Sequence, residues 1–110
     1  MARLDGLVTQ QKLYLDPDLT LDRMSRKLGV PVKQVSAAIN RTTGENVSRY
    51  INARRVGAAC EALKAGDSVT SSMLSAGFNT KSNFNREFLR VTGQTPSIWL
   101  KGQLEDRAKG

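Results

Sequence analysis

Apolar residues recur at helical spacing along this chain, and turn residues separate them into short segments. The clearest segment is 77–96, in which Thr80 stands where a helix would begin and Gly93 stands where it would end. A threonine can cap the free N–H groups of a first turn, and glycine suits a left-handed residue at a helix end. Spacings of i, i+4 and i+7 place three apolar residues on one face of this helix: Phe84, Phe88 and Val91.

The opposite face of this predicted helix is polar and partly basic. Its side chains are of the kinds that bond base edges and phosphates in DNA. They are Lys81, Ser82, Asn83, Asn85, Arg86 and Arg90. Thr80 also offers a helix N-terminus and a hydroxyl group to a phosphate. We therefore predict a short helix that is fixed by its apolar face and presents its polar face to a nucleic acid.

The first part of the chain has a similar pattern. Thr20 can cap a helix that ends at Gly29, and the next helix begins after Pro31. The inward side of that next helix is formed by Val32, Val35, Ile39 and Thr42. Its outward side is formed by Lys33, Ser36, Ala37, Asn40 and Arg41. Two helices joined by a turn of three or four residues, the second with a polar outer face, form a helix-turn-helix unit.

The remaining segments are also helical in pattern, so we predict an all-α fold with about seven helices. A stripe of Leu4, Leu7, Val8 and Leu15 predicts a helix over 3–15. A long helix is expected over 46–64, and Thr70 is expected to cap a short helix over 71–76. The last helix should follow Pro96 and be amphipathic through Ile98, Trp99, Leu100 and Leu104. Strand patterns flanked by hairpin turns are not evident.

An internal repeat relates the two parts of the chain. The run Arg-Thr-Thr-Gly at 41–44 matches Arg-Val-Thr-Gly at 90–93, and the same offset of 49 positions pairs Val35 with Phe84 and Ile39 with Phe88. We therefore predict two helix-turn-helix units in a single domain over 1–110, the first at about 4–45 and the second at about 66–108. The linker between them is expected at about 46–65, and its helix over 46–64 would be about 28 Å long. Successive major grooves on one DNA face lie about 34 Å apart.

The charge of the chain indicates a polyanionic partner. The net charge is +7, and residues 23–90 hold 12 basic and 4 acidic side chains, which concentrates the positive field in the middle of the chain. Charge alone is equally compatible with a solvated basic surface. A non-specific nucleic-acid binder is therefore an alternative, and a protein–protein module that docks its N-terminal helix on a partner is another.

Catalysis is not expected, and neither is a cofactor or a metal. The chain has no histidine, a single cysteine and no glycine-rich phosphate loop between a strand and a helix. Cys60 lies among alanines in a predicted helix, where a small buried residue is favoured over a reactive thiol. A signal peptide and an apolar run near 18 residues are absent from the sequence, so we expect a cytoplasmic, nucleoid-associated location.

The motifs of the second unit resemble the signature of AraC/XylS-type bacterial transcription regulators. Those motifs are Gly77-Phe78, Thr80, Phe84-Asn85-Arg86-Glu87-Phe88 and Gly93-Gln94-Thr95-Pro96, and the resemblance covers roughly residues 18 to 101. It implies a sequence-specific DNA-binding regulator whose third and sixth helices enter neighbouring major grooves. The first of these helices would then present Lys33, Ser36 and Ala37. The second would present Lys81, Ser82, Asn83, Asn85 and Arg86.

The chain departs from the family pattern at several positions. Pro31 stands where the family has a serine cap, and the small Ala37 stands where many relatives carry a larger polar residue. Ser72 and Met73 replace an isoleucine and an alanine, which would loosen the packing of the second unit. Arg55 matches a frequent family arginine, which would either form a bracing ion pair or contact a phosphate.

The resemblance also bears on the partners of the chain. Double-stranded operator DNA is the expected partner, and RNA polymerase is a further candidate. No small-molecule site is expected in this chain, and oligomerisation would use a region outside it. Residues 1–15 resemble a linker or an expression start, so we expect a C-terminal domain excised from a longer regulator. Stand-alone relatives of this size exist, and a membrane-attached parent protein is also compatible.

Overall fold

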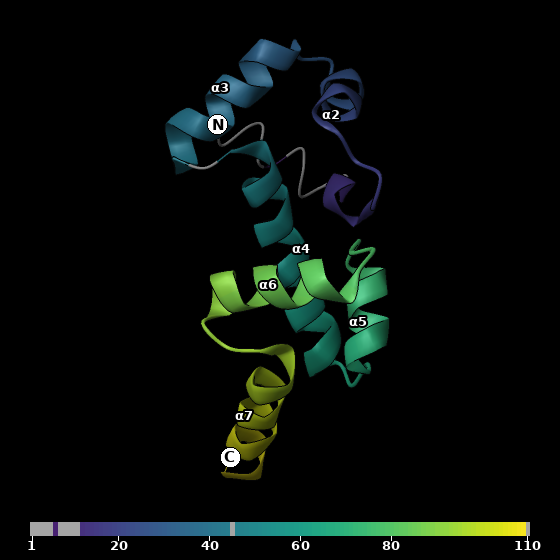
Figure 1. Cartoon of the computed structure of the whole chain (residues 1–110), viewed down its shortest axis with the longest axis vertical. Coiled ribbons are helices and arrows are strands. Elements are labelled where there is room, and N and C mark those ends of the chain that lie inside the picture. The colour runs from purple at the N-terminus through teal and green to yellow at the C-terminus, as the bar shows by residue number, and fades with distance from the viewer. Residues whose placement is uncertain (1–5, 7–11, 45, 110) are drawn as a thin grey trace. The chain divides into compact units, whose positions relative to one another are not determined.

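The computed structural model describes residues 6, 12–44 and 46–109 of the chain. The described part is helical and contains no strand, which confirms the predicted all-α class. Its elements are the 3-10 helix η1 (Leu13–Leu15) and the α-helices α2 (Leu21–Leu28), α3 (Val32–Thr43), α4 (Val47–Lys64), α5 (Val69–Ser75), α6 (Lys81–Thr92) and α7 (Pro96–Lys109) (Figure 1).

The helix predicted near the start of the chain falls largely on residues that the structure does not describe. Leu4, Leu7 and Val8, which carried that prediction, lie outside the described residues. The last residues of the predicted helix, Leu13–Leu15, form the 3-10 helix η1 rather than an α-helix. Leu13 in this short helix is buried, so it fixes the start of the described chain to the core of the first unit.

The chain divides into two compact units, Met1–Asn52 and Ala53–Gly110. The division falls within α4, so this helix begins in the first unit and ends in the second. The predicted long helix is confirmed, and it is continuous over Val47–Lys64. Asn46 precedes it as a cap, because its Oδ1 accepts from the N–H of Arg49 at 2.8 Å.

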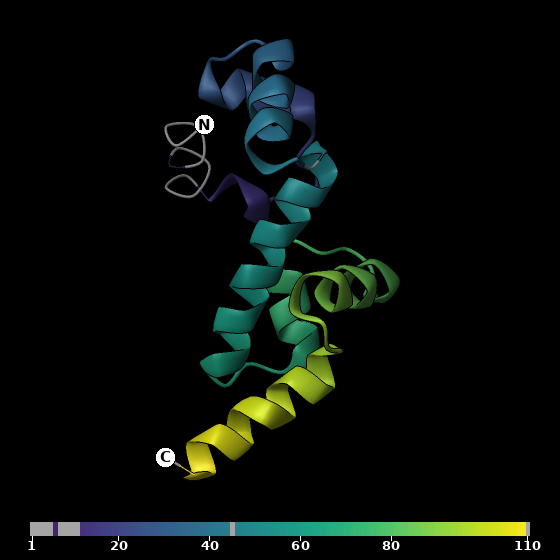
Figure 2. The same ribbon diagram turned by 90° about the vertical axis from the view of Figure 1, so that its left-hand side faces the viewer.

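The core of the first unit lies between α2, α3 and the start of α4 (Figure 2). Its buried residues are Leu13, Leu19, Met24, Val35, Ile39, Tyr50 and Ile51. Thr20 caps α2 as predicted, with its hydroxyl accepting from the N–H of Arg23 at 3.2 Å. Gly29 ends α2 with a φ of 67°, a left-handed conformation that glycine adopts without a steric penalty.

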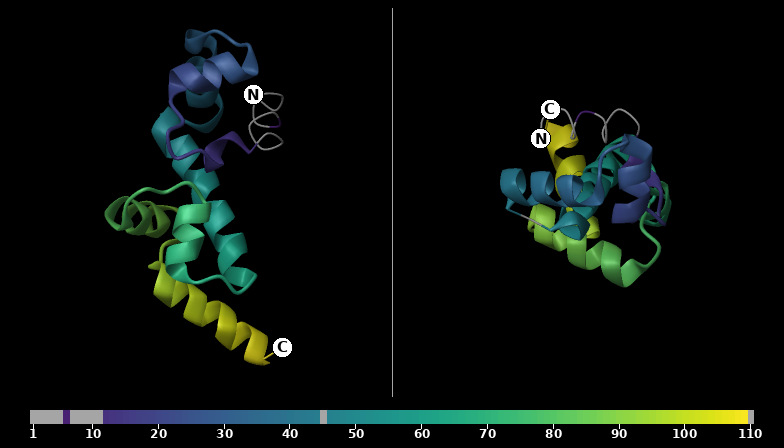
Figure 3. Two further views of the ribbon diagram at one scale, coloured as in Figure 1. Left: turned by 90° about the vertical axis from the view of Figure 1, so that its right-hand side faces the viewer. Right: turned by 90° about the horizontal axis from the view of Figure 1, so that it is seen from above.

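The core of the second unit is built on four aromatic rings in series. Phe78 lies 5.2 Å from Phe84, Phe84 lies 5.5 Å from Phe88, and Phe88 lies 5.9 Å from Trp99 between ring centroids. All three contacts are edge-to-face, the arrangement in which an aromatic pair adds about 0.5–1.5 kcal/mol beyond the burial of area. The rings connect α6 to α7, which follows it after a short turn (Figure 3).

Three expectations about the second unit were wrong in detail. Ser68, not Thr70, caps α5, because its hydroxyl accepts from the N–H of Ser71 at 3.1 Å. Val91 is 41% exposed although it continues the spacing of the two buried phenylalanines. In α7 only part of the apolar set packs inward: Trp99 and Leu100 contact the core, whereas Ile98 and Leu104 are exposed.

Candidate nucleic-acid interface

The first unit presents α3 as a helix with one buried side and one exposed side. The turn before it is three residues long, from Gly29 to Pro31. Val35 and Ile39 are fully buried against α2 and the start of α4. Because α3 is fixed in this way, its opposite side faces solvent. Four of the predicted contact residues are exposed on α3: Lys33, Ala37, Asn40 and Arg41. The fifth, Ser36, is half-buried.

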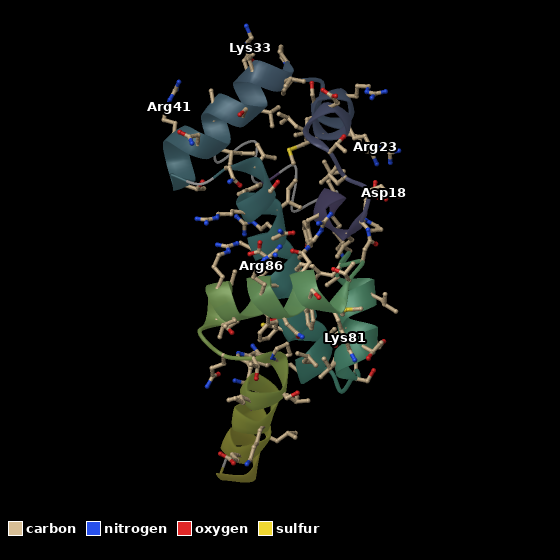
Figure 4. The ribbon with its side chains drawn as sticks, viewed as in Figure 1. Asp18, Arg23, Lys33, Arg41, Lys81 and Arg86 are labelled. Carbon is tan, nitrogen blue, oxygen red and sulfur yellow. The ribbon has the colours of Figure 1, made fainter. Side chains whose placement is uncertain are left out.

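Lys33 and Arg41 place positive charge near the two ends of α3. Their side chains extend away from the ribbon (Figure 4), and both residues are exposed. Lysine and arginine bind phosphate by charge and by donating hydrogen bonds. Between them, the exposed Ala37 offers only a methyl group, so this face combines cations at its ends with a small apolar surface in the middle.

The N-terminus of α3 has no side-chain cap. Pro31 occupies the cap position and supplies no acceptor from its side chain. Its carbonyl accepts from the N–H groups of Gln34 and Val35 at 3.0 and 3.1 Å, which starts the helix. The N–H groups that precede these point out of the first turn, and such groups favour an anionic acceptor.

The second unit presents α6 in the same manner. Phe84 and Phe88 are fully buried, and they fix the inward side of the helix. Four of the predicted contact residues are exposed on α6: Lys81, Ser82, Asn85 and Arg86. Asn83 is half-buried at the edge of this surface. We call the surface formed by Ser82, Asn85, Arg86 and their neighbour Leu89 the outward face of α6.

Thr80 is used by the helix that it precedes. Its hydroxyl oxygen accepts from the N–H of Asn83 at 3.2 Å, which confirms the predicted cap. A hydroxyl group has one proton to donate in addition to the lone pairs that accept. Thr80 is exposed, so that proton is available to an external acceptor while the oxygen caps α6.

Asn83 and Arg86 form one polar unit on α6. Nη2 of Arg86 donates to Oδ1 of Asn83 at 2.7 Å. Bidentate recognition of adenine requires both the oxygen and the nitrogen of an amide. Since the oxygen of Asn83 is engaged by Arg86, the amide of Asn85, which is exposed, is better suited to that contact.

Arg90, another of the predicted contact residues, pairs with a carboxylate on its own helix. Its Nε donates to Oε2 of Glu87 at 2.5 Å, and its side chain is only 26% exposed. Glu87 is buried in the second unit, and the sequence interpretation overlooked it. The i, i+3 spacing to a cation and the position between two buried phenylalanines were the available signals.

Arg55 is buried in the second unit, and Cys60 is half-buried there. Arg55 is 8% exposed, which favours an internal role over contact with a phosphate. Cys60 is half-buried, and burial raises the pKa of its thiol, an effect that Lys64 opposes and Glu61 reinforces. A raised pKa leaves less thiolate at neutral pH, so Cys60 is suited to packing rather than to reaction.

In the part of the chain that the structure describes, metal ligands or a membrane-spanning helix would mark other kinds of site. No group of three metal-ligating side chains gathers there. Within the same residues, every helix is too short or too polar to cross a bilayer. The exposed polar faces of α3 and α6 form the candidate functional surface.

Comparison with known proteins bears on these faces. A family model described as a helix-turn-helix domain matches residues 24–102. The right origin-binding protein of Escherichia coli (strain K12) and the transcriptional regulator Rob of Salmonella typhimurium are each 28% identical to the chain over 89 residues. The match covers 80% of this chain and 31% of each relative. The chain thus spans about a third of the length of these relatives.

Solved structures with the same fold include two domains of response regulators. The C-terminal domain of AraT from Geobacillus stearothermophilus has a TM-score of 0.76 and 22% identity, over 92% of this chain and 83% of that one. The C-terminal domain of yesN from Fusobacterium nucleatum has a TM-score of 0.72 and 19% identity, over 90% of this chain and 95% of that one. The family model covers most of the chain, including parts of both units. The chain belongs to the helix-turn-helix family of AraC/XylS type, a family of DNA-binding transcription regulators.

Proposed function

We propose that the chain binds operator DNA sequence-specifically and places α3 and α6 in successive major grooves. The observation that carries this proposal is a duplicated arrangement. Each unit contains a helix, a turn and a second helix whose apolar side is buried and whose polar side is exposed. A major groove admits one α-helix, and base edges there carry a distinct pattern of donors and acceptors. In this proposal the chain works as a first helix-turn-helix unit at about 4–45, a linker helix at about 46–65 and a second helix-turn-helix unit at about 66–108.

In this proposal α3 mainly positions the protein on the DNA and recognises the shape of the groove. Lys33 and Ser36 contact the groove near the start of α3, and the methyl group of Ala37 lies against an apolar part of a base edge. Asn40 and Arg41 contact the DNA backbone at the other end. Phosphate contacts fix the register of a protein on the duplex without reading its sequence. The first unit would therefore tolerate more variation in the DNA sequence that it contacts than the second unit would.

In this proposal α6 supplies most of the base-specific contacts. Lys81, Ser82 and Asn85 carry donors that are exposed near the start of the helix, where recognition helices contact base edges. Arg86, oriented by its bond to Asn83, reaches a guanine or a phosphate. Thr80 donates its hydroxyl proton to a phosphate. Arg90, which is paired with Glu87, contributes a partly neutralised charge at the edge of the interface.

The rival function is non-specific nucleic-acid binding through the basic surface, which the net charge of +7 favours. A selection of binding sites from random duplexes, followed by a competition titration, separates the two. A sequence-specific regulator should prefer the selected duplex over random DNA by about 10³-fold or more. Affinities within about tenfold of each other for the two duplexes would favour the rival.

A charge-matched pair of variants sharpens this test. Lys81→Ala removes a lysine from α6, and Lys101→Ala removes an exposed lysine from α7. Under the proposal, Lys81→Ala lowers the preference for the selected duplex, whereas Lys101→Ala leaves it unchanged. Under non-specific binding, both variants weaken all duplexes by similar factors, since each loses one positive charge.

The remaining partners belong to the same proposal. RNA polymerase is a candidate protein partner of a DNA-bound regulator, and oligomerisation would use a region outside these 110 residues. Both interactions would take place on chromosomal DNA in the cytoplasm. Transcription from a template that carries the selected site, with and without the protein, would detect the contact with RNA polymerase as a change in transcript yield.

A further inference from the structure

We propose that Leu89 is a specificity-determining residue that contacts the 5-methyl group of a thymine in the major groove. The inference rests on the proposed function, because it needs α6 to lie in that groove. Leu89 is 50% exposed on α6, although the preceding residue, Phe88, is fully buried. A single exposed leucine is ordinary on a protein surface. Its position on the outward face of α6 makes this one distinctive.

Helix geometry aligns Leu89 with the polar residues of the outward face. It follows Ser82 by seven positions, Asn85 by four and Arg86 by three, and residues at these spacings lie on one side of a helix. The three polar residues are exposed, as Leu89 is. From Ser82 to Leu89 the helix rises about 10 Å, which corresponds to about three base-pair steps of DNA. The leucine would therefore be within the footprint of the polar contacts.

The chemistry of this position selects one base. A leucine side chain cannot bond a phosphate or the donors and acceptors of a base edge. Among the four bases, thymine presents an apolar group, the 5-methyl, in the major groove. Arg86, one turn before Leu89, supplies positive charge beside it and so favours the approach of the polyanion. Burial of the leucine against the thymine methyl removes apolar surface of both partners from water.

The first unit differs at the equivalent position. The 49-residue offset of the internal repeat pairs Leu89 with Asn40, which is polar and exposed. The two recognition helices therefore would not read the same base at this point, and a thymine preference would belong to the second unit. Leu74 of α5, which is 59% exposed, provides a matched control outside the recognition helices.

The test combines a side-chain change with the removal of a single methyl group from DNA. The full chain first selects a duplex from a random library, and each thymine of that duplex is then replaced in turn by deoxyuridine, which lacks the 5-methyl group. Fluorescence anisotropy gives the affinity of the wild-type chain, Leu89→Ala and Leu74→Ala for every duplex. Circular dichroism checks that each variant retains its helix content.

The proposal expects one thymine at which the methyl group and Leu89 act together. There, deoxyuridine should weaken binding by the wild-type chain and by Leu74→Ala about fourfold, the value expected for one buried methyl group. The same replacement should change binding by Leu89→Ala by less than about 1.5-fold. Equal losses for wild type and Leu89→Ala at every thymine would overturn the inference and leave the proposed function standing. A selection that returns no shared sequence would overturn both.

Discussion

Nη2 of Arg86 donates to Oδ1 of Asn83 at 2.7 Å, while the N–H of Asn83 donates to the hydroxyl of Thr80 at 3.2 Å. These bonds tie the guanidinium to the capped first turn of α6. Its remaining N–H groups can still bond an external acceptor. We therefore expect Arg86→Ala to weaken operator binding by about 1–3 kcal/mol, measured by fluorescence anisotropy against the selected duplex.

The pattern of that loss identifies the partner of Arg86. A base contact would relax the sequence preference at one position of the site. A phosphate contact would instead weaken all duplexes and lower the slope of log affinity against log salt by about one. An Arg86→Ala variant that binds like wild type over the whole salt range would contradict a role for Arg86 in the interface.

Asn83 should act through Arg86 rather than on its own. Asn83→Ala is expected to weaken binding in the wild-type background and to have little further effect once Arg86 is alanine. Residues that share a hydrogen bond typically show a coupling of about 0.5–3 kcal/mol in a double-mutant cycle. The cycle between Asn85 and Arg86 is the control, and we expect its two losses to add. If the losses of binding free energy for Asn83→Ala and Arg86→Ala add, the bond between the two side chains has no role in DNA binding.

The two recognition helices should contribute unequally to sequence discrimination. Lys81→Ala and Asn85→Ala are expected to reduce the ratio of the affinity for the selected duplex to the affinity for random DNA. The reason is that the native side chains carry hydrogen-bond donors that are exposed on α6. Ala37→Gly on α3 should change affinity by no more than its effect on helix propensity, about 1 kcal/mol. The opposite result, with discrimination lost in α3 variants and kept in α6 variants, would reverse the assignment.

The aromatic series should control the stability of the second unit. Phe84 is fully buried, and its ring lies between those of Phe78 and Phe88. Phe84→Ala should therefore cost about 3–5 kcal/mol and unfold this unit. Val91→Ala on the same helix is the control, and it should cost much less because Val91 is already exposed. Thermal melts followed by circular dichroism compare the two; similar small shifts would mean that the rings contribute little.

Ser72 offers a stabilising substitution. Its side chain is completely buried, and its hydroxyl has no hydrogen-bond partner among the described residues. A buried polar group without a partner costs about 1–3 kcal/mol, so Ser72→Ala should raise the Tm. Ser71→Ala tests the same change at an exposed position of α5, which isolates the contribution of helix propensity. A Tm that rises equally in both variants would show that the buried hydroxyl carries no penalty.

Cys60 should be dispensable for DNA binding. Burial raises the pKa of its thiol, so the folded state holds the thiol proton more tightly than the unfolded state does. The stability that this proton contributes is complete below the pKa of the unfolded thiol, and it is lost as the pH rises through the higher pKa of the folded state. Cys60→Ser should keep the affinity for DNA and lose a modest amount of stability from burying a hydroxyl. A large loss of affinity in a folded Cys60→Ser variant would indicate a thiol function.

Local signals made much of this fold predictable. Thr20 and Thr80 were expected to cap their helices, and each accepts the expected N–H bond. Phe84 and Phe88 were expected to be buried from their spacing alone, and both are. Such features depend on residues within one or two turns of each other, which is the range over which a sequence pattern is informative.

Features that depend on the packing of several helices were missed. Val91 continues the spacing of Phe84 and Phe88, but it lies in the last turn of α6 and is exposed. Ser68 and Thr70 are both acceptable caps, and only the path of the chain into α5 selects Ser68. The burial of Glu87, and its pairing with Arg90, likewise depends on what surrounds α6.

Pro31 makes the start of α3 chemically different from the start of α6. Thr80 brings a hydroxyl oxygen to the start of α6, where it accepts from the N–H of Asn83, one of the otherwise free N–H groups of the first turn. The start of α3 has no such oxygen from a side chain, so one more N–H group of its first turn is left for an external acceptor. If α3 lies against DNA as proposed, a phosphate oxygen would accept the bond that the Thr80 hydroxyl accepts in α6, so the DNA strand itself would cap α3.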